Sequence, residues 1–217
     1  MFLFGLPVLL PVVFLACLLA PARALEQGPA RWPDTPAARR AAQEMLAALN
    51  TELLTHPSAT ATLERWCAAH GIAAPSEIRA ERVREAEGEA PAEVRALLGA
   101  DASTPVRHRR VRLRCGATVL SEADNYYLPE RLTPQMNQVL DSTDTPFGKV
   151  VRPLGFGRST LDSRVLWSAD APAAADGTLA FPAFVLTHRA VLTLPDGIPF
   201  SALIERYTAA VLPAPPH

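Results

Sequence analysis

Apolar residues recur at helical spacing near the start of the chain. Between residues 45 and 53 they lie three or four positions apart, which places them on one face of a helix. Thr35 is a suitable cap for this helix and Pro36 suits its first turn. A second helix is predicted between residues 58 and 71, with Leu63 on its inner side and a glycine at its end. The pattern therefore begins with two helices joined by a short turn.

Apolar and polar residues alternate from 106 to 120, which predicts a strand. Alternate side chains of a strand point to opposite faces. We therefore expect one face to hold Val111, Leu113 and Cys115, and the other to hold His108, Arg110, Arg112 and Arg114. The apolar face should lie in the core. The arginine face is either exposed to solvent or forms the wall of an anion-binding pocket.

The rest of the chain alternates between short strands and short helices. Residues 76–90 are ambiguous: propensity favours a helix, and a strand remains open. The further predictions are helices at 92–98 and from 133 onward, strands at 123–129, 155–167 and 183–194, and a last element at 201–212 that is strand or helix. Together these elements predict an α+β fold, with a single antiparallel β-sheet and helices packed on one face.

The first 24 residues are strongly apolar and end in Ala22-Arg23-Ala24, a pattern that signal peptidase cuts. This predicts a signal peptide over 1–24 and a periplasmic or secreted protein. A membrane anchor is the alternative, but Pro7 and Pro11 interrupt the apolar run, so no stable membrane span is expected after cleavage. Residues 25–52 then form a linker and the N-terminal helix, and 213–217 form a frayed tail.

Charge and cysteine content exclude several classes of function. The chain has 21 Lys and Arg against 22 Asp and Glu, so no nucleic-acid partner is expected. Cys67 and Cys115 have no metal-site spacing, and no metal or cofactor is predicted. We favour two buried thiols for them. A disulfide is the alternative if the protein is exported.

Four segments carry a resemblance to a known family. They are L-L-T-H-P-S-A-T in the helical pair, R-R-V-R-L-R-C-G in the central strand, T-P-F-G in a loop, and H-R-A-V-L-T-L-P-D-G-I-P-F-S-A-L-I-E-R-Y near the end. In this order and spacing, residues 53–212 resemble the chorismate lyase family, whose fold is shared with ligand-binding domains of some transcription regulators. The resemblance implies a chorismate lyase-like domain that needs no cofactor. We expect the protein to be a monomer.

The resemblance also implies a site for an aromatic carboxylate. Arg110 would bind the carboxylate, Phe147 and Gly148 would present backbone N–H groups, and Ala59 would lie in a flap over the ligand. Glu205 would be the catalytic acid that eliminates pyruvate from chorismate to give 4-hydroxybenzoate, if burial raises its pKa. Arg189 is a candidate second carboxylate ligand.

Two other interpretations remain open. The protein is then either an exported, non-catalytic small-molecule-binding protein, or an interaction protein whose pocket is filled by side chains. The binding protein would keep Arg110 as its anion-binding residue. If neither residue has a functional role, Arg110 belongs to a solvated strand face and Glu205 is a surface partner of a neighbouring arginine.

Overall fold

The computed structural model describes Met1 and residues 31–213. The predicted signal peptide, its cleavage site, the alternative anchor and residues 214–217 lie outside the described residues. Across residues 31–213, the helices are all too short or too polar to span a bilayer.

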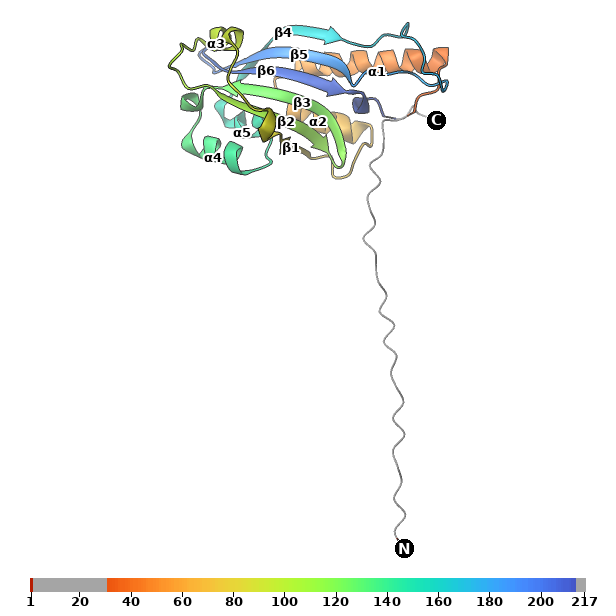
Figure 1. The fold of residues 1–217 in the computed structure, drawn as a ribbon, viewed down its shortest axis with the longest axis horizontal. Helices are drawn as coiled ribbons and strands as arrows, with labels where there is room; N and C mark the ends of the chain where they lie inside the picture. Colours follow the sequence, from red (N-terminus) through yellow and green to blue (C-terminus); the bar gives the residue numbers. More distant parts are fainter. Residues whose placement is uncertain (2–30, 214–217) are drawn as a thin grey trace.

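A single antiparallel sheet of six strands organises the domain (Figure 1). The order across the sheet is β1-β2-β3-β6-β5-β4. The strands are β1 Ile78–Arg82, β2 Arg107–Cys115, β3 Thr118–Tyr127, β4 Gly157–Val165, β5 Phe184–Thr193 and β6 Pro199–Thr208. This confirms the predicted α+β class and the single antiparallel sheet. The last element, left open from the sequence, is a strand.

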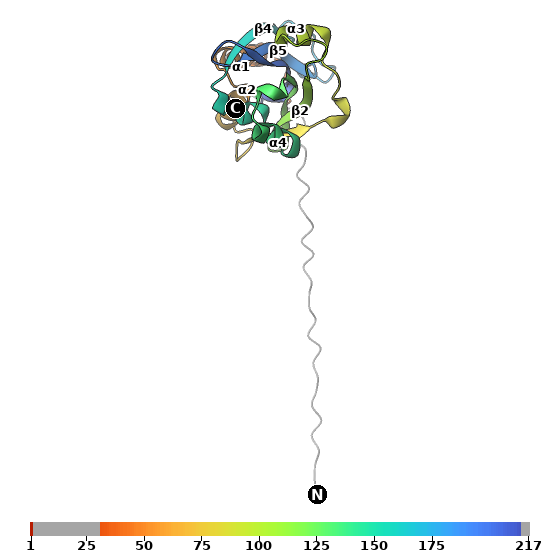
Figure 2. The ribbon, with the colours of Figure 1, turned by 90° about the vertical axis from the view of Figure 1, so that its left-hand side faces the viewer.

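Most helices cover one face of the sheet. The helices are α1 Pro36–Thr55, α2 Ala59–Ala69, α3 Ala92–Leu98, α4 Pro134–Ser142 and α5 Phe147–Val150. One core packs α1 and α2 against the sheet, and a second packs α4 and α5 against the same face. The exception is α3, whose Val94 and Leu98 pack on the opposite face against Tyr126, Val191 and Ala202. Viewed end-on, α3 lies near β4 and β5, while α4 lies near β2 (Figure 2).

The helix starts follow the capping chemistry that the sequence predicts. The Thr35 side chain accepts from Ala38 N at 3.1 Å, Ser58 accepts from Ala61 N at 3.3 Å, and Thr133 accepts from Met136 N at 3.1 Å. Each side chain satisfies an N–H that has no partner within its helix.

Two predictions from local pattern are wrong. Residues 106–120 are not one strand, because Gly116 at φ +57° turns the chain between β2 and β3. Residues 78–82 form strand β1 and not the favoured helix. The reason is pairing: Ile78 lies opposite Cys115, and the alternate residues of β1 are buried. Long-range pairing outweighs the helix propensity of this charged segment.

Cys67 of α2 and Cys115 of β2 form a disulfide with a Cα–Cα distance of 6.6 Å. The favoured interpretation as two thiols is therefore wrong, although both residues are buried as expected. The bond joins a helix to the sheet across a sequence separation of 48. It ties the helical layer to β2, next to the β1 edge of the sheet.

Replacing both cysteines by alanine should lower the free energy of unfolding by roughly 4 kcal/mol, because the unfolded chain regains the entropy that a closed loop of this length removes. Urea denaturation of the oxidised protein and of the double variant measures the difference. Equal midpoints for the two proteins would show that the bond does not constrain the unfolded chain.

Candidate functional site

A small pocket lies between the sheet and the segment that joins α1 to α2. Its volume is about 30 Å³, which holds about two water molecules. Four predicted site residues line it: Ala59, Phe147, Gly148 and Glu205. The remaining lining residues are Pro57, Ser58, Thr60, Val111, Leu113, Ala123, Asn125, Phe156, Arg158, Leu192 and Leu203. The pocket is thus mostly apolar, with one ionic pair.

That ionic pair joins Glu205 of β6 to Arg158 of β4. The Arg158 Nη2 lies 2.6 Å from Glu205 Oε2, and the two side chains are only 4% and 6% exposed. The Tyr207 hydroxyl donates to the same carboxylate oxygen at 3.2 Å. Arg158 Nε has no partner. The carboxylate is therefore held by two donors at one end of the pocket.

The pair keeps Glu205 ionised. Burial raises the pKa of the Glu205 carboxyl, but attraction to Arg158 and the hydrogen bonds from Arg158 and Tyr207 lower it more, so its pKa falls below the usual value. The expectation of a raised pKa for Glu205 is thus wrong for this state. An ionised carboxylate has no proton to donate to a leaving group.

Buried polar residues support the pair from β5. His188, which lies opposite Glu205 across the β5–β6 ladder, places Nε2 2.7 Å from Asn50 Oδ1 and 3.1 Å from the Ser163 hydroxyl. Burial lowers the pKa of His188. The histidine is therefore neutral at pH 7, and it joins α1 to the sheet behind the pocket.

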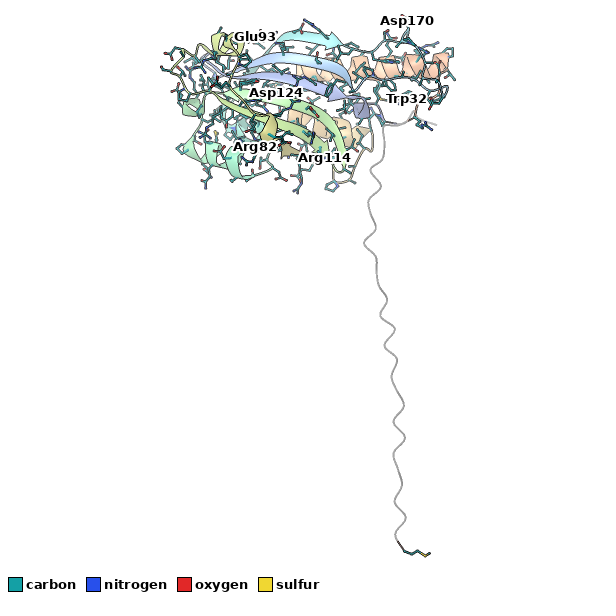
Figure 3. All side chains as sticks on the ribbon, viewed as in Figure 1. Trp32, Arg82, Glu93, Arg114, Asp124 and Asp170 are labelled. Atoms are coloured by element: carbon teal, nitrogen blue, oxygen red, sulfur yellow. A yellow bond between two sulfur atoms is a disulfide. The ribbon has the colours of Figure 1, made fainter. Side chains whose placement is uncertain are left out.

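Arg110 does not line the pocket, which corrects its expected role. It lies on the opposite face of the sheet, with Nη2 2.9 Å from Glu122 and Nη1 3.4 Å from Asp124. Asp124 also pairs with Arg206 at 2.7 Å. Figure 3 shows Asp124 over the middle of the sheet. Arg112 and the other outer arginines belong to the same network of ion pairs.

Arg189 also lies away from the pocket. Its Nη2 is 3.2 Å from Glu93 of α3, on the same outer face of the sheet as Arg110. Because Glu93 comes from the helix that covers this face, Arg189 cannot serve as a second ligand in the pocket. The proposed pair of carboxylate-binding arginines is not brought together.

The sequence interpretation missed Arg109, which is fully buried. It lies on the pocket side of β2 with Val111, opposite the pocket residue Asn125. Among residues 31–213, Arg109 Nε and Nη1 have no hydrogen-bond partner, and Nη2 makes only long contacts of 3.4 and 3.3 Å to the carbonyls of Thr143 and Thr145. Strand alternation, counted back from Val111, would have identified it.

Arg109 is a buried cation that pairs with no carboxylate of the described part of the chain. Burial, followed by repulsion from Arg82, lowers the pKa of Arg109 to about 10. It therefore stays charged at neutral pH, in a place where charge is costly to bury. This guanidinium has its hydrogen-bonding capacity largely unused.

Gly148 brings α5 close to the start of α2. A Cβ atom at this position would lie 3.1 Å from Ser58 Oγ and 3.2 Å from Thr60 Oγ1. Both neighbours line the pocket, and Ser58 is also the cap of α2. The absence of a side chain at Gly148 therefore sets the width of the pocket at this end.

Replacing Gly148 by alanine should lower the free energy of unfolding by about 1 kcal/mol, since the new methyl group displaces the cap of α2. Thermal unfolding measures the loss. Gly88→Ala is the matched control, because nothing lies within 4 Å of a Cβ there. Equal losses for the two variants would contradict the tight contact.

Nothing in the pocket suggests a bound metal. Throughout the described part of the chain, no group of three His, Cys, Asp or Glu side chains could hold an ion.

Comparison with known proteins shows a close relative. The chain is 47% identical over 197 residues to the uncharacterized protein y4mC of Sinorhizobium fredii, covering 85% of this chain and 83% of the relative. No family model matches the chain.

Similar solved structures are distant. The effector domain of PhnF from Mycobacterium smegmatis is 15% identical, with 70% of this chain and 88% of that chain covered and a TM-score of 0.47. A second structure of PhnF from the same organism is 15% identical, with 76% and 70% covered and a TM-score of 0.48. At this level the likeness carries no argument about ligand or activity.

Proposed function

The chain belongs to the same family as protein y4mC of Sinorhizobium fredii. Because the name of that relative states no activity, we propose a function from the pocket itself. The protein binds a small aromatic carboxylate, as the resemblance to chorismate lyases implies. The carboxylate pairs with Arg109, and the ring lies in the apolar part of the pocket. This assigns to Arg109 the role that the sequence interpretation gave to Arg110.

The observation that carries this proposal is the unpaired guanidinium of Arg109. Arginine binds carboxylates through two parallel hydrogen bonds, and Nε and Nη1 of Arg109 are both without a partner. A buried charge of this kind is expected to be compensated by a counter-ion. A ligand carboxylate would supply one. Arg109 does not itself line the pocket in this state, but its cross-strand partner Asn125 does.

The opposite end of the pocket suits a polar group on the ring. Val111, Leu113 and Leu203 offer an apolar wall, and the Arg158–Glu205 pair lies beyond it. Because the Glu205 carboxylate accepts hydrogen bonds, a ring hydroxyl can donate to it. A hydroxybenzoate therefore satisfies both ends.

The pocket must open to admit a ring, because its present volume of about 30 Å³ is too small. We infer that the segment from Pro57 to Thr60, at the start of α2, moves outward as a flap. Ala59 lies in this segment and lines the pocket. Its small side chain leaves more room for a ring than a large one would.

Elimination of pyruvate from chorismate is the second candidate function, and the burial of Glu205 in the pocket favours it. Catalysis by Glu205 requires that the ligand first separate it from Arg158, since only then does burial raise the pKa of the carboxyl. In the described state the pair is intact, so binding without turnover is the better supported function.

We also propose that the protein is exported. The support is the apolar N-terminal sequence together with the Cys67–Cys115 disulfide, because such bonds persist in oxidising compartments.

Two assays separate the candidates. Thermal unfolding with a panel of aromatic carboxylates should show a raised melting temperature, because a ligand that binds only the native state stabilises it. Incubation with chorismate, followed by detection of 4-hydroxybenzoate, tests turnover, with Glu205→Gln as the control. A melting temperature unchanged by every carboxylate would refute the proposed binding.

A further inference from the structure

The two edges of the sheet differ in how they are covered. At the β1 edge, the backbone N–H of Ala80 donates to the carbonyl of Asp144 at 2.7 Å, so a loop occupies that side. At the other edge, β4 pairs only with β5 within residues 31–213. Figure 1 shows β4 along the border of the sheet. An open strand edge is a template for pairing with another strand.

Large apolar side chains are exposed along this open edge. Leu161, Val165 and Leu166 are 51%, 49% and 47% exposed. Elsewhere in residues 31–213, only Leu54 and Ile198 are large, apolar and comparably exposed. Beside Leu161, a surface hollow of about 450 Å³ lies between α3 and β4, with Leu97 in its wall. Apolar surface concentrated in one place marks an interface.

The charges on β4 are complementary to those on a second copy of β4 that runs antiparallel to it. Asp162 and Arg164 lie two positions apart on the outer face of the sheet, opposite Arg189 and Thr187 of β5, and within one chain they pair with each other at 2.9 Å. An antiparallel copy of β4 centred on Ser163 sets Asp162 opposite the copy's Arg164, and Arg164 opposite the copy's Asp162. Cross-strand pairs of opposite charge stabilise such a ladder.

The middle of this edge is held in place from behind. The Ser163 hydroxyl donates to Asn50 Oδ1 of α1 at 3.0 Å. The strand therefore presents its outer backbone groups from a fixed position. The charges that usually protect a strand edge here favour one partner, because they are of opposite sign and symmetric about Ser163.

We propose that β4 pairs in antiparallel fashion with β4 of a second copy of this chain. The two sheets then form one continuous sheet about a two-fold axis at Ser163, in which each interface patch contacts itself. The new pairing runs from Asp162 to Arg164, because β4 has a bulge between Thr160 and Asp162 that places Leu161 outside the ladder, on the outer face. This replaces the monomer expected from the sequence.

Sedimentation velocity over a range of protein concentrations tests the proposal by a charge exchange. The purified protein should form a reversible dimer. Asp162→Arg and Arg164→Asp should each weaken dimerisation by about tenfold, because each sets like charges opposite one another. The double exchange should restore dimerisation to near the wild-type level. Ile198→Asp, an exposed apolar residue away from β4, should have no effect.

Three results would overturn the proposal. They are a monomer at every concentration, a dimer that tolerates both single exchanges, and a double exchange that dimerises no better than the singles. Thermal unfolding of each variant establishes that the fold is retained, as expected for Arg164, which is 71% exposed.

Discussion

Replacing Arg158 by leucine should lower the free energy of unfolding by about 3–5 kcal/mol at pH 7. The reason is that Glu205 then remains buried without its cation, which costs far more than the pair itself contributes. Domains are stable by only about 5–15 kcal/mol in total, so this variant should unfold readily. Urea denaturation measures the loss, with Arg79→Leu, an exposed arginine on β1, as the control.

The loss from Arg158→Leu should shrink as the pH falls, because protonation removes the uncompensated charge on Glu205. In the wild type, by contrast, a falling pH lowers the stability that Glu205 contributes. The folded pKa of Glu205 lies below its unfolded value of 4.5, so its contribution to stability is present above pH 4.5 and is lost as the pH falls. Replacing Arg158 and Glu205 together by leucine should recover most of the stability. A single variant that loses less than about 1 kcal/mol would show that the pair is not truly buried.

Replacing Arg109 by methionine should raise the free energy of unfolding by about 1–3 kcal/mol, the opposite sign to most core substitutions. Methionine keeps the apolar part of the side chain and removes a buried cation that has no carboxylate partner within residues 31–213. The wild-type protein therefore retains a destabilising residue in the ligand-free state. Such residues are expected at functional sites.

The neighbouring residue provides the control. Arg110→Met should lower the free energy of unfolding by up to about 1 kcal/mol, because Arg110 is partly exposed and paired with Glu122 and Asp124. Thermal and urea denaturation of both variants measure the expected increase in the free energy of unfolding for Arg109→Met and the expected decrease for Arg110→Met. If Arg109→Met is destabilised like a cavity-forming substitution, the guanidinium has a structural partner and is not held for a ligand.

The elements that could be predicted from the sequence are those fixed by local chemistry. The caps Thr35, Ser58 and Thr133 define their helices because a hydroxyl next to a helix start acts over three residues. The faces of β2 could be predicted as well, because alternation needs no knowledge of the partner strand. The strand β1 could not, since its conformation depends on pairing with β2.

The candidate site was predicted only in part, because some of its residues follow no local pattern. Ala59, Phe147, Gly148 and Glu205 do meet in one pocket, although they are far apart in the sequence. Arg110 was one residue from the position that faces the pocket, and a shift of one residue reverses the face of a strand. Arg158 carried no local pattern, because its role appears only when the order of strands brings β4 and β6 to either side of β5.

The most direct test of the central claim is calorimetric titration of 4-hydroxybenzoate into the wild type, Arg109→Met and Arg110→Met. We predict that the wild type and Arg110→Met bind with equal affinity, and that Arg109→Met binds about 10- to 100-fold more weakly, the range expected for loss of hydrogen bonds to a charged group. Binding that survives in Arg109→Met and is lost in Arg110→Met would contradict the account.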